Sequence, residues 1–479
     1  MQVQHDRMWT RLSLDSLAHM FINQATISQF ALLESSTLQV DHRNNNDISQ
    51  STCSWALYWQ RSSLLGLTSP HHPHIRVPVN SPRVLASASN VKHILHFSDV
   101  HLNISESLDA TEPVEMQFKY GNDAPITMLK SALEFAKKLM PDPDFFLYTG
   151  DHVVHGDLTD KFLADTIETN VKTVARYYST KDNDTNLDIT VLLGNADTTP
   201  DYTMNLTDPE AETNPSITLI SAAWEDILST SNLDWFNHRG YRVFDLDENL
   251  AVLTLNTVPY SPSHSPDTTN ISDPFGQFAT KRCSSSGTLA NVGSRIHQDV
   301  QSHREPIRRH RQAQFFAHVH SIEFRIPLTS EQLVQEETEG TELVPLFMSA
   351  AISPIYNNNP EFMIWDFDAN SYEVLDFTVY GTNISSDSQE VDWKPLFKAS
   401  TAYGVNSLRT TELNALVSRL ASDSALLEQY YYNSKVQSYL QSPCVDVACQ
   451  SKWLCTTQWY TTSEDFEACV KELEMKRSA

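Results

Sequence analysis

The chain is poor in basic residues and in cysteine, and it has no long apolar run. It holds 34 Lys and Arg against 60 Asp and Glu among 479 residues, which gives a formal net charge of −26. Nucleic-acid binding is not expected, because phosphate backbones are bound by clustered basic side chains. The absence of about twenty consecutive apolar residues predicts that there is no transmembrane helix. No apolar segment follows a basic start in residues 1–30, so no signal peptide is visible there.

The rest of the composition is that of a globular protein. Hydrophobic residues make up 40% of the chain, which is enough to bury the core of one large domain or of two.

Two features favour an extracytoplasmic location. Acceptors for N-glycosylation, which have meaning only in a secreted protein, stand at Asn103, Asn183, Asn205, Asn270 and Asn383. Most of the cysteines crowd into the last segment, at Cys444, Cys449, Cys455 and Cys469. Zinc binding is the competing interpretation of this group, but the spacings are not CxxC pairs. We therefore predict two disulfides in the tail and leave their pairing open.

Residues 1–88 show only weak periodicity. They include a polar stretch near Asn44 and the run Pro70-His-His-Pro-His74. Histidines in a Pro-rich linker are more often solvated than bound to a metal. We expect an atypical, disordered leader over this range.

The stretch from His93 to Asn103 carries the first candidate ligands. Its apolar residues predict a buried strand that opens into a loop at Ser98. Asp99 and His101 lie two positions apart and can point the same way. A carboxylate and an imidazole on one side suit a divalent metal such as zinc, manganese or iron. The pair alone also fits an ordinary Asp and a solvated His at a strand end.

Two further predicted strands end in a polar pair. One covers 144–151 and ends in Gly150-Asp151, and the next covers 188–195 and ends in Gly194-Asn195. Helical spacing of apolar residues over 127–140 and 162–178 separates the strands. A βαβαβ order with parallel pairing brings all three polar ends to one edge of the sheet, where α/β proteins place their sites. This arrangement favours the metal interpretation.

Another short apolar run, over 314–317, stops at His318 and His320. Two histidines at a strand end are harder to explain as solvated side chains than one. The remaining expected elements are a helix over 217–228, a hairpin of 241–246 with 250–256, strands over 343–352, 362–367 and 374–380, and a helical stretch over 402–440.

These polar pairs occur in the order, and on the elements, of the calcineurin-like metallophosphoesterases. More narrowly, the chain resembles the acid sphingomyelinase-like phosphodiesterase and endopolyphosphatase branch. The segments that carry this likeness are 149–155, 194–200, 273–277, 315–320 and 353–360. The resemblance implies an α/β fold, a four-layer α/β/β/α sandwich over 89–400, followed by a helical, cysteine-containing C-terminal region over 401–479.

The resemblance also implies a centre with two divalent metal ions, zinc or else manganese or iron. Asp99, His101 and His320 would hold one ion. Asn195 and His318 would hold the other, and Asp151 would bridge the two. His155 matches the histidine that this branch places near the leaving group, so it is the expected proton donor. The competing interpretation of His155 is an exposed loop histidine.

Two departures from the family pattern stand out. Ala196 occupies a position at which much of the superfamily has a histidine. The second departure is the absence, between Gln277 and Gln314, of a Gly-His-x-Pro motif that would supply a further ligand to the second metal. In its place, residues 280–311 are basic and lack a strand pattern. This composition is consistent with a divergent segment or with a gene-model error. The candidate substitutes are His297, His303 and His310, with His297 first, but none follows an apolar strand.

We therefore expect a metal-dependent phosphoric-ester hydrolase that is secreted or resides in a lysosomal or vacuolar lumen. The resemblance implies a lipid phosphodiester such as sphingomyelin, a nucleotide or polyphosphate as the substrate. No saposin-like cysteine module precedes the domain, which favours soluble substrates. The alternative is a catalytically impaired binding protein that keeps the fold and lacks one histidine ligand.

Overall fold

The computed structural model describes residues 55–60, 91–104, 118–178, 190–267 with short interruptions, 311–326, 345–384, 391–458 and 463–478. The histidine cluster before residue 75 and the divergent segment as far as residue 310, with His297, His303 and His310, lie outside these described residues.

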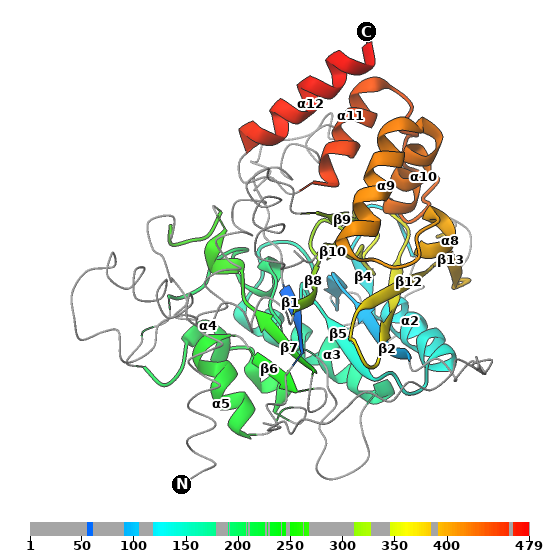
Figure 1. Cartoon of the computed structure of the whole chain (residues 1–479). Helices are drawn as coiled ribbons and strands as arrows, with labels where there is room; N and C mark the ends of the chain where they lie inside the picture. The colour runs from blue at the N-terminus through cyan, green and yellow to red at the C-terminus, as the bar shows by residue number, and fades with distance from the viewer. Residues whose placement is uncertain are drawn as a thin grey trace, which may run out of the picture.

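Two mixed β-sheets form the centre of the chain (Figure 1). The five-stranded sheet has the order β13 (Lys394–Lys398), β12 (Val374–Gly381), β11 (Glu361–Asp368), β2 (Val91–Phe97) and β5 (Phe145–Tyr148). The six-stranded sheet has the order β6 (Arg242–Asp245), β7 (Leu250–Leu255), β1 (Trp55–Gln60), β8 (Arg311–Phe316), β10 (Leu346–Met348) and β9 (Glu323–Arg325). Within these sheets β2 runs parallel to β5 and β8 runs parallel to β10, and the other described pairs are antiparallel. A short parallel pair, β3 (Leu102–Asn103) with β4 (Ala124–Pro125), stands apart.

The side chains of β11 show how the layers pack, because successive residues of a strand point to opposite faces. Phe362 and Ile364 belong to an apolar cluster with helix α2 (Ile126–Leu139). Trp365 lies in a second cluster with Phe315 and Phe347 of the six-stranded sheet. The Phe315 ring meets the Trp365 ring edge-on at 4.7 Å. One face of the five-stranded sheet therefore packs on the other sheet, and its opposite face packs on α2.

Helices complete the outer layers. Helix α2 buries one apolar stripe and ends before Pro141, and α3 (Asp160–Tyr178) lies beside it. Beside β6 and β7, Figure 1 shows α4 (Pro215–Thr218) and α5 (Thr230–Arg239). None of the described helices is both long and apolar enough to span a membrane.

The C-terminal region is helical and contains two disulfides, as predicted. Its helices are α8 (Ala399–Tyr403), α9 (Thr410–Ser422), α10 (Ser424–Ser434), α11 (Val447–Thr456) and α12 (Ser463–Ser478). The disulfides, whose pairing the sequence left open, join Cys444 to Cys449 and Cys455 to Cys469. The expected fold class, a mixed α/β domain followed by a helical region with cysteines, is confirmed.

The strand expected over 188–195 is not formed by its described residues. Thr190 and 192–194 are irregular, although the Thr190 backbone N–H donates to the Phe146 carbonyl of β5 at 3.2 Å. The Thr190 hydroxyl accepts from the Tyr148 backbone N–H at 2.7 Å and donates to the Tyr148 carbonyl at 2.6 Å. The Thr190 side chain thus forms the hydrogen bonds with β5 that the backbone of a further strand would have formed.

The prediction of a disordered leader over residues 1–88 is wrong for Trp55–Gln60, because these residues form β1 between β7 and β8. The sequence Trp-Ala-Leu-Tyr-Trp-Gln is rich in the aromatic residues that favour strands.

Two expected helices are interrupted. The helix over 217–228 is replaced by α4 and the 3-10 turn η2 (Ser221–Trp224). The stretch over 402–440 is divided at Gly404, which adopts a left-handed φ of 61°, and at Asp423. The Asp423 carboxylate caps α10 by accepting from the backbone of Ala425 and Leu426, so it ends one helix and begins the next.

Candidate metal centre

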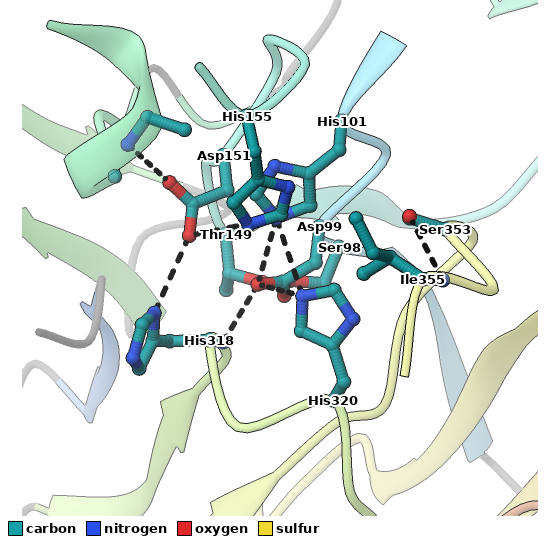
Figure 2. A network of polar contacts seen from close by, with 12 residues as sticks. Ser98, Asp99, His101, Thr149, Asp151, His155, His318, His320, Ser353 and Ile355 are labelled. Atoms are coloured by element: carbon teal, nitrogen blue, oxygen red, sulfur yellow. Dashed lines mark hydrogen bonds and ion pairs between the residues drawn. The ribbon is translucent and has the colours of Figure 1, made fainter. Parts of the chain in front are cut away.

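The predicted ligands gather where three strands end. Asp99 and His101 follow β2, Asp151 follows β5, and His318 and His320 follow β8. Figure 2 shows their side chains pointing toward one another from these separate loops. The strand pair β2 and β5 is parallel, so the two loops leave the sheet at the same edge.

Asp99, His101 and His320 form the first candidate cluster. His320 Nε2 lies 3.4 Å from Asp99 Oδ1 and 3.2 Å from His101 Nε2. His101 Nε2 lies 3.9 Å from the same Asp99 oxygen. All three residues are at most 2% exposed. One oxygen and two imidazole nitrogens thus converge in a buried space.

Asp151 connects this cluster with a second one. Its Oδ2 atom lies 4.0 Å from His101 Nε2 on one side and 3.6 Å from His318 Nδ1 on the other. Asp99, Asp151 and His318 have ligand atoms close enough to share an ion, as have Asp99, His101 and His320. Asp151 therefore stands where a bridging carboxylate would stand.

The Asn195 side chain lies beside the second cluster. Its amide oxygen faces two acceptors, Asp151 Oδ2 at 3.3 Å and His318 Nδ1 at 3.1 Å. An oxygen surrounded by acceptors is satisfied by a cation between them. The alternative is that the amide turns over, so that its nitrogen donates to both.

The backbone at the expected ligands is unusual. Positive φ angles of 45°, 42°, 52°, 78° and 49° occur at Asp99, His101, Asp151, His318 and His320. This left-handed region is uncommon outside glycine and is concentrated at functional sites. Hydrogen bonds hold the loops in it, since His101 N donates to Asp151 O at 3.0 Å and His318 N donates to Asp99 Oδ1 at 2.8 Å.

The electrostatics keep these groups in the forms that bind metals. Burial, reinforced by the charges of neighbouring histidines, holds the pKa of His101 well below its usual value, so its ring is neutral. Burial raises the pKa of Asp99, but hydrogen bonds and charge from His320 outweigh it and leave that pKa below the usual value. A neutral imidazole and an ionised carboxylate are the ligand forms that a divalent cation requires.

His155 lies at the rim of the centre. Its ring stacks on the His101 ring, with centroids 3.9 Å apart. Asp123 accepts from the His155 backbone N–H at 3.0 Å, and its other oxygen lies 3.0 Å from His155 Nδ1. Burial lowers the pKa of His155, but the Asp123 hydrogen bond and charge outweigh it, so the pKa is raised. Ser353 donates to Asp123 Oδ1 at 3.0 Å and fixes the carboxylate in turn.

Asp123 is not predicted as a site residue by any sequence pattern. This residue precedes β4 and α2 rather than ending a strand, and its partner His155 lies 32 residues away. No local sequence pattern predicts such a pairing.

Gly194 is required by close packing. A Cβ atom at this position would lie 2.0 Å from Asp151 Oδ1 and 2.7 Å from the Asp151 backbone nitrogen. The Gly-Asn pair therefore brings the chain against Asp151 and delivers Asn195 to the second cluster.

The donor set suits a pair of borderline cations such as zinc, manganese or iron, since it consists of carboxylates, imidazoles and one amide. His101, Asp123 and His155 also lie close enough to hold an ion. However, His101 Nδ1 is already 2.9 Å from the Val153 carbonyl, which leaves only its Nε2 atom, and that atom faces the first cluster. The carbonyl contact orients the ring as outer hydrogen bonds do in metal sites.

Two packed mixed sheets with Asp and His clusters at the strand ends are typical of binuclear metallophosphoesterases. Family models agree with this class. The model "Calcineurin-like phosphoesterase" matches residues 92–321, and "Acid sphingomyelin phosphodiesterase C-terminal region" matches residues 343–476. The chain belongs to the calcineurin-like metallophosphoesterases and carries an acid sphingomyelinase C-terminal region.

Curated relatives point to the same branch. The chain is 24% identical to a protein named Sphingomyelinase phosphodiesterase D of Dictyostelium discoideum, over 67% of this chain and 76% of that one. It is 23% identical to Acid sphingomyelinase-like phosphodiesterase 3b of Homo sapiens, over 75% of this chain and 86% of the relative. It is also 23% identical to Cyclic GMP-AMP phosphodiesterase SMPDL3A of Rattus norvegicus, over 78% of this chain and 88% of the relative.

Proposed function

We propose that the chain is a metal-dependent phosphodiesterase with a two-metal centre. Asp99, His101 and His320 would hold one ion, Asn195 and His318 the other, and Asp151 both. The observation that carries this proposal is the position of Asp151 Oδ2, which is 4.0 Å from a nitrogen of one cluster and 3.6 Å from a nitrogen of the other. We propose zinc as the metal, because imidazole-rich sites favour it, with manganese or iron as alternatives.

When bound, two such cations activate water and neutralise the phosphate oxygens during in-line displacement. The protein contributes the geometry of the ligands and a proton. His155 is placed at the rim, with Nδ1 held by Asp123, so its Nε2 atom is the one that would donate to the leaving oxygen. The raised pKa keeps His155 protonated at mildly acidic pH.

The substrate class is a phosphodiester in this proposal. The names of the relatives include a sphingomyelinase phosphodiesterase and a cyclic GMP-AMP phosphodiesterase, so a lipid headgroup and a nucleotide are both candidates. Polyphosphate remains a third candidate on the motif resemblance. A secretory, lysosomal or vacuolar location agrees with the two disulfides and with the exposure of the glycosylation acceptors Asn205 and Asn383.

A second candidate function follows from the sequence that stands between Gln277 and Gln314. It has no Gly-His-x-Pro motif, so the second metal position has one histidine fewer than the family pattern. Loss of a ligand weakens a metal position. In this alternative the chain is a binding protein that holds one ion and does not turn substrate over.

Metal content and turnover decide between the two. The purified full chain is assayed for zinc by plasma mass spectrometry and for hydrolysis of bis(p-nitrophenyl) phosphate. Two ions per chain and turnover that is lost in Asp151→Ala and after chelation support the hydrolase. Asp142→Ala is the matched control, because Asp142 is an exposed carboxylate that precedes β5 whereas Asp151 follows it. One ion and no turnover of this diester or of sphingomyelin, cyclic dinucleotide and polyphosphate would establish the binding protein.

A further inference from the structure

A chain of buried polar side chains leads from the core between the two sheets to the Asp99 carboxylate. The Trp365 indole nitrogen donates to His96 Nδ1 at 3.2 Å, and His96 Nε2 lies 3.0 Å from Thr149 Oγ1. Thr149 Oγ1 donates to Ser98 Oγ at 2.6 Å, and Ser98 Oγ donates to Asp99 Oδ2 (Figure 2). All five residues are at most 2% exposed. Bulk water does not reach these groups, so the chain has to satisfy its own donors and acceptors.

The tryptophan end sets the direction of these hydrogen bonds. An indole nitrogen can only donate, so Trp365 requires a bare acceptor at His96 Nδ1. Burial lowers the pKa of His96 from 6.5 to about 3, so its ring is neutral and carries one proton. That proton is therefore on Nε2, which donates to Thr149 Oγ1. The Thr149 hydroxyl accepts this bond and has its own proton left for Ser98 Oγ.

The aspartate end requires the same direction. An ionised carboxylate only accepts, so Ser98 gives its single hydroxyl proton to Asp99 Oδ2. Ser98 Oγ then has only lone pairs for Thr149, which has to donate to it. The reverse direction would set His96 Nδ1–H against the Trp365 N–H and leave Asp99 Oδ2 without a donor. All four hydrogen bonds therefore point toward Asp99.

This direction leaves the other oxygen of Asp99 for a metal. Oδ2 is held by Ser98, whereas Oδ1 lies 3.4 Å from His320 Nε2 and 3.9 Å from His101 Nε2. We propose that Ser98 is a positioning residue, oriented by the chain from His96, that holds the Asp99 carboxylate with Oδ1 toward the first metal position. This inference rests on the proposed function, because the first position is part of that proposal.

The carboxylate is fixed at both oxygens and still has a lone pair for a cation. Asp99 Oδ1 accepts from the His318 backbone N–H at 2.8 Å, which uses one of its two lone pairs. A hydroxyl that accepts a hydrogen bond is itself a stronger donor, because linked bonds polarise one another. Thr149 therefore strengthens the bond that Ser98 donates. Outer hydrogen bonds to metal ligands are commonly worth about 10- to 100-fold in metal affinity, and we expect that range for Ser98.

A double-mutant cycle on zinc affinity tests the role of Ser98. Competition with a chromophoric chelator gives the Kd values, of which the tighter is assigned to the first position because more of the proposed ligands hold it. Ser98→Ala should weaken this ion by about 10- to 100-fold, and Thr149→Val by about 3- to 10-fold. Because Thr149 acts through Ser98, its replacement in the Ser98→Ala background should change the Kd by less than about twofold. Equal weakening in both backgrounds would overturn the inference.

Ser349→Ala is the matched control. The Ser349 hydroxyl is also buried and lies 3.4 Å from His96 Nε2, but it donates to the Phe316 carbonyl at 3.5 Å and stands outside the chain. The tighter Kd should stay within about twofold of the wild type in this variant. A loss as large as that of Ser98→Ala would show that any buried hydroxyl here has the same effect, and the inference would be wrong. Thermal melting of each metal-free variant checks folding.

The position of the His96 proton gives a test that needs neither metal nor a folded variant at Ser98. Two-bond 1H–15N spectra of the metal-free full chain, labelled at histidine, distinguish a protonated ring nitrogen from a bare one. The His96 signals are identified by their loss in His96→Gln. We expect a protonated Nε2 and a bare Nδ1. A proton on Nδ1, or a mixture of both tautomers, would overturn the inference.

The outcomes also separate this inference from the proposed function. If the wild type binds two ions and hydrolyses the diester while Ser98→Ala leaves the tighter Kd within about twofold of the wild type, the inference fails and the proposed function stands. A wild type that binds no ion and shows no turnover removes both.

Discussion

Gly194→Ala is the smallest change that should disable the centre. The added Cβ would lie 2.0 Å from Asp151 Oδ1, 2.3 Å from Asp151 Cγ and 2.7 Å from the Asp151 backbone nitrogen. Rotation of the carboxylate alone does not relieve the contact, because the backbone nitrogen is also too close. Ordinary contacts begin near 3.4 Å, so the two loops must separate by about 1 Å.

A displacement of about 1 Å at a reacting centre can cost on the order of 100-fold in rate. We therefore expect kcat/KM for bis(p-nitrophenyl) phosphate to fall by about 100-fold, equivalent to roughly 2.7 kcal/mol of transition-state stabilisation. Overpacking should also lower the free energy of unfolding by about 1–3 kcal/mol, measured with urea. Since Asp151 is proposed to touch both ions, zinc content should fall as well.

Gly381→Ala is the matched control. Its Cβ would lie 2.6 Å from Leu396 Cδ1 and 3.0 Å from the Pro360 carbonyl, in a crowded part of β12 that holds none of the proposed ligands. It should lose stability by a similar amount and keep its zinc. If Gly194→Ala retained two ions and a kcat/KM within threefold of the wild type, Asp151 would not be the bridge and the assignment of the centre would be refuted.

Three further predictions concern the rim, the tail and a buried histidine. Asp123→Ala removes the carboxylate that holds His155 Nδ1, so kcat should fall by about 10- to 100-fold while zinc content is unchanged; unchanged kcat would show that His155 needs no orientation. Cys469→Ser opens the disulfide with Cys455, whose sequence separation is 14, and should lower the free energy of unfolding by about 3 kcal/mol in urea; a loss below about 0.5 kcal/mol would contradict this. Burial lowers the pKa of His96 from 6.5 to about 3, so below pH 6.5 the unfolded state binds a proton that the folded state does not. His96 should therefore cost the metal-free protein about 1.4 kcal/mol of stability per pH unit between pH 6 and 4, and the stability advantage of the wild type over His96→Gln should shrink across that range. An advantage that is constant with pH would contradict the burial argument.

The sequence predicts the candidate site better than it predicts the sheets. Asp99, Asp151 and His318 each come within three residues of the end of an apolar run, so local periodicity placed them at strand ends, and the structure brings these ends together. Strand order depends on pairing between segments far apart in the chain, and no local pattern encodes it. The insertion of Trp55–Gln60 between β7 and β8 is of this kind.

Local competition by side chains explains the other differences. The apolar run before Gly194 looks like a strand, but the Thr190 hydroxyl occupies the backbone partners of Tyr148. Residues 402–440 have a helical composition throughout. Asp423 nevertheless divides them, because an aspartate is more favourable at the N-cap of a helix than in its interior, and its carboxylate caps the following helix. Asp123 contacts a histidine that lies in another loop, so only the folded chain shows its partner.

The geometry also bears on the choice between a hydrolase and an impaired binding protein. Asp99 and Asp151 are at most 2% exposed, and two buried carboxylates cost several kcal/mol each unless opposite charge accompanies them. The left-handed backbone at residues such as His101 and His320 adds a further cost of roughly 1–3 kcal/mol each. Neither feature stabilises the fold, and together they favour a cation at the first position, for which Asp99, His101 and His320 are the proposed ligands. In the proposed assignment, the missing histidine affects only the second position. A single bound ion is therefore compatible with both functions, and occupancy of the second position together with turnover is what distinguishes them.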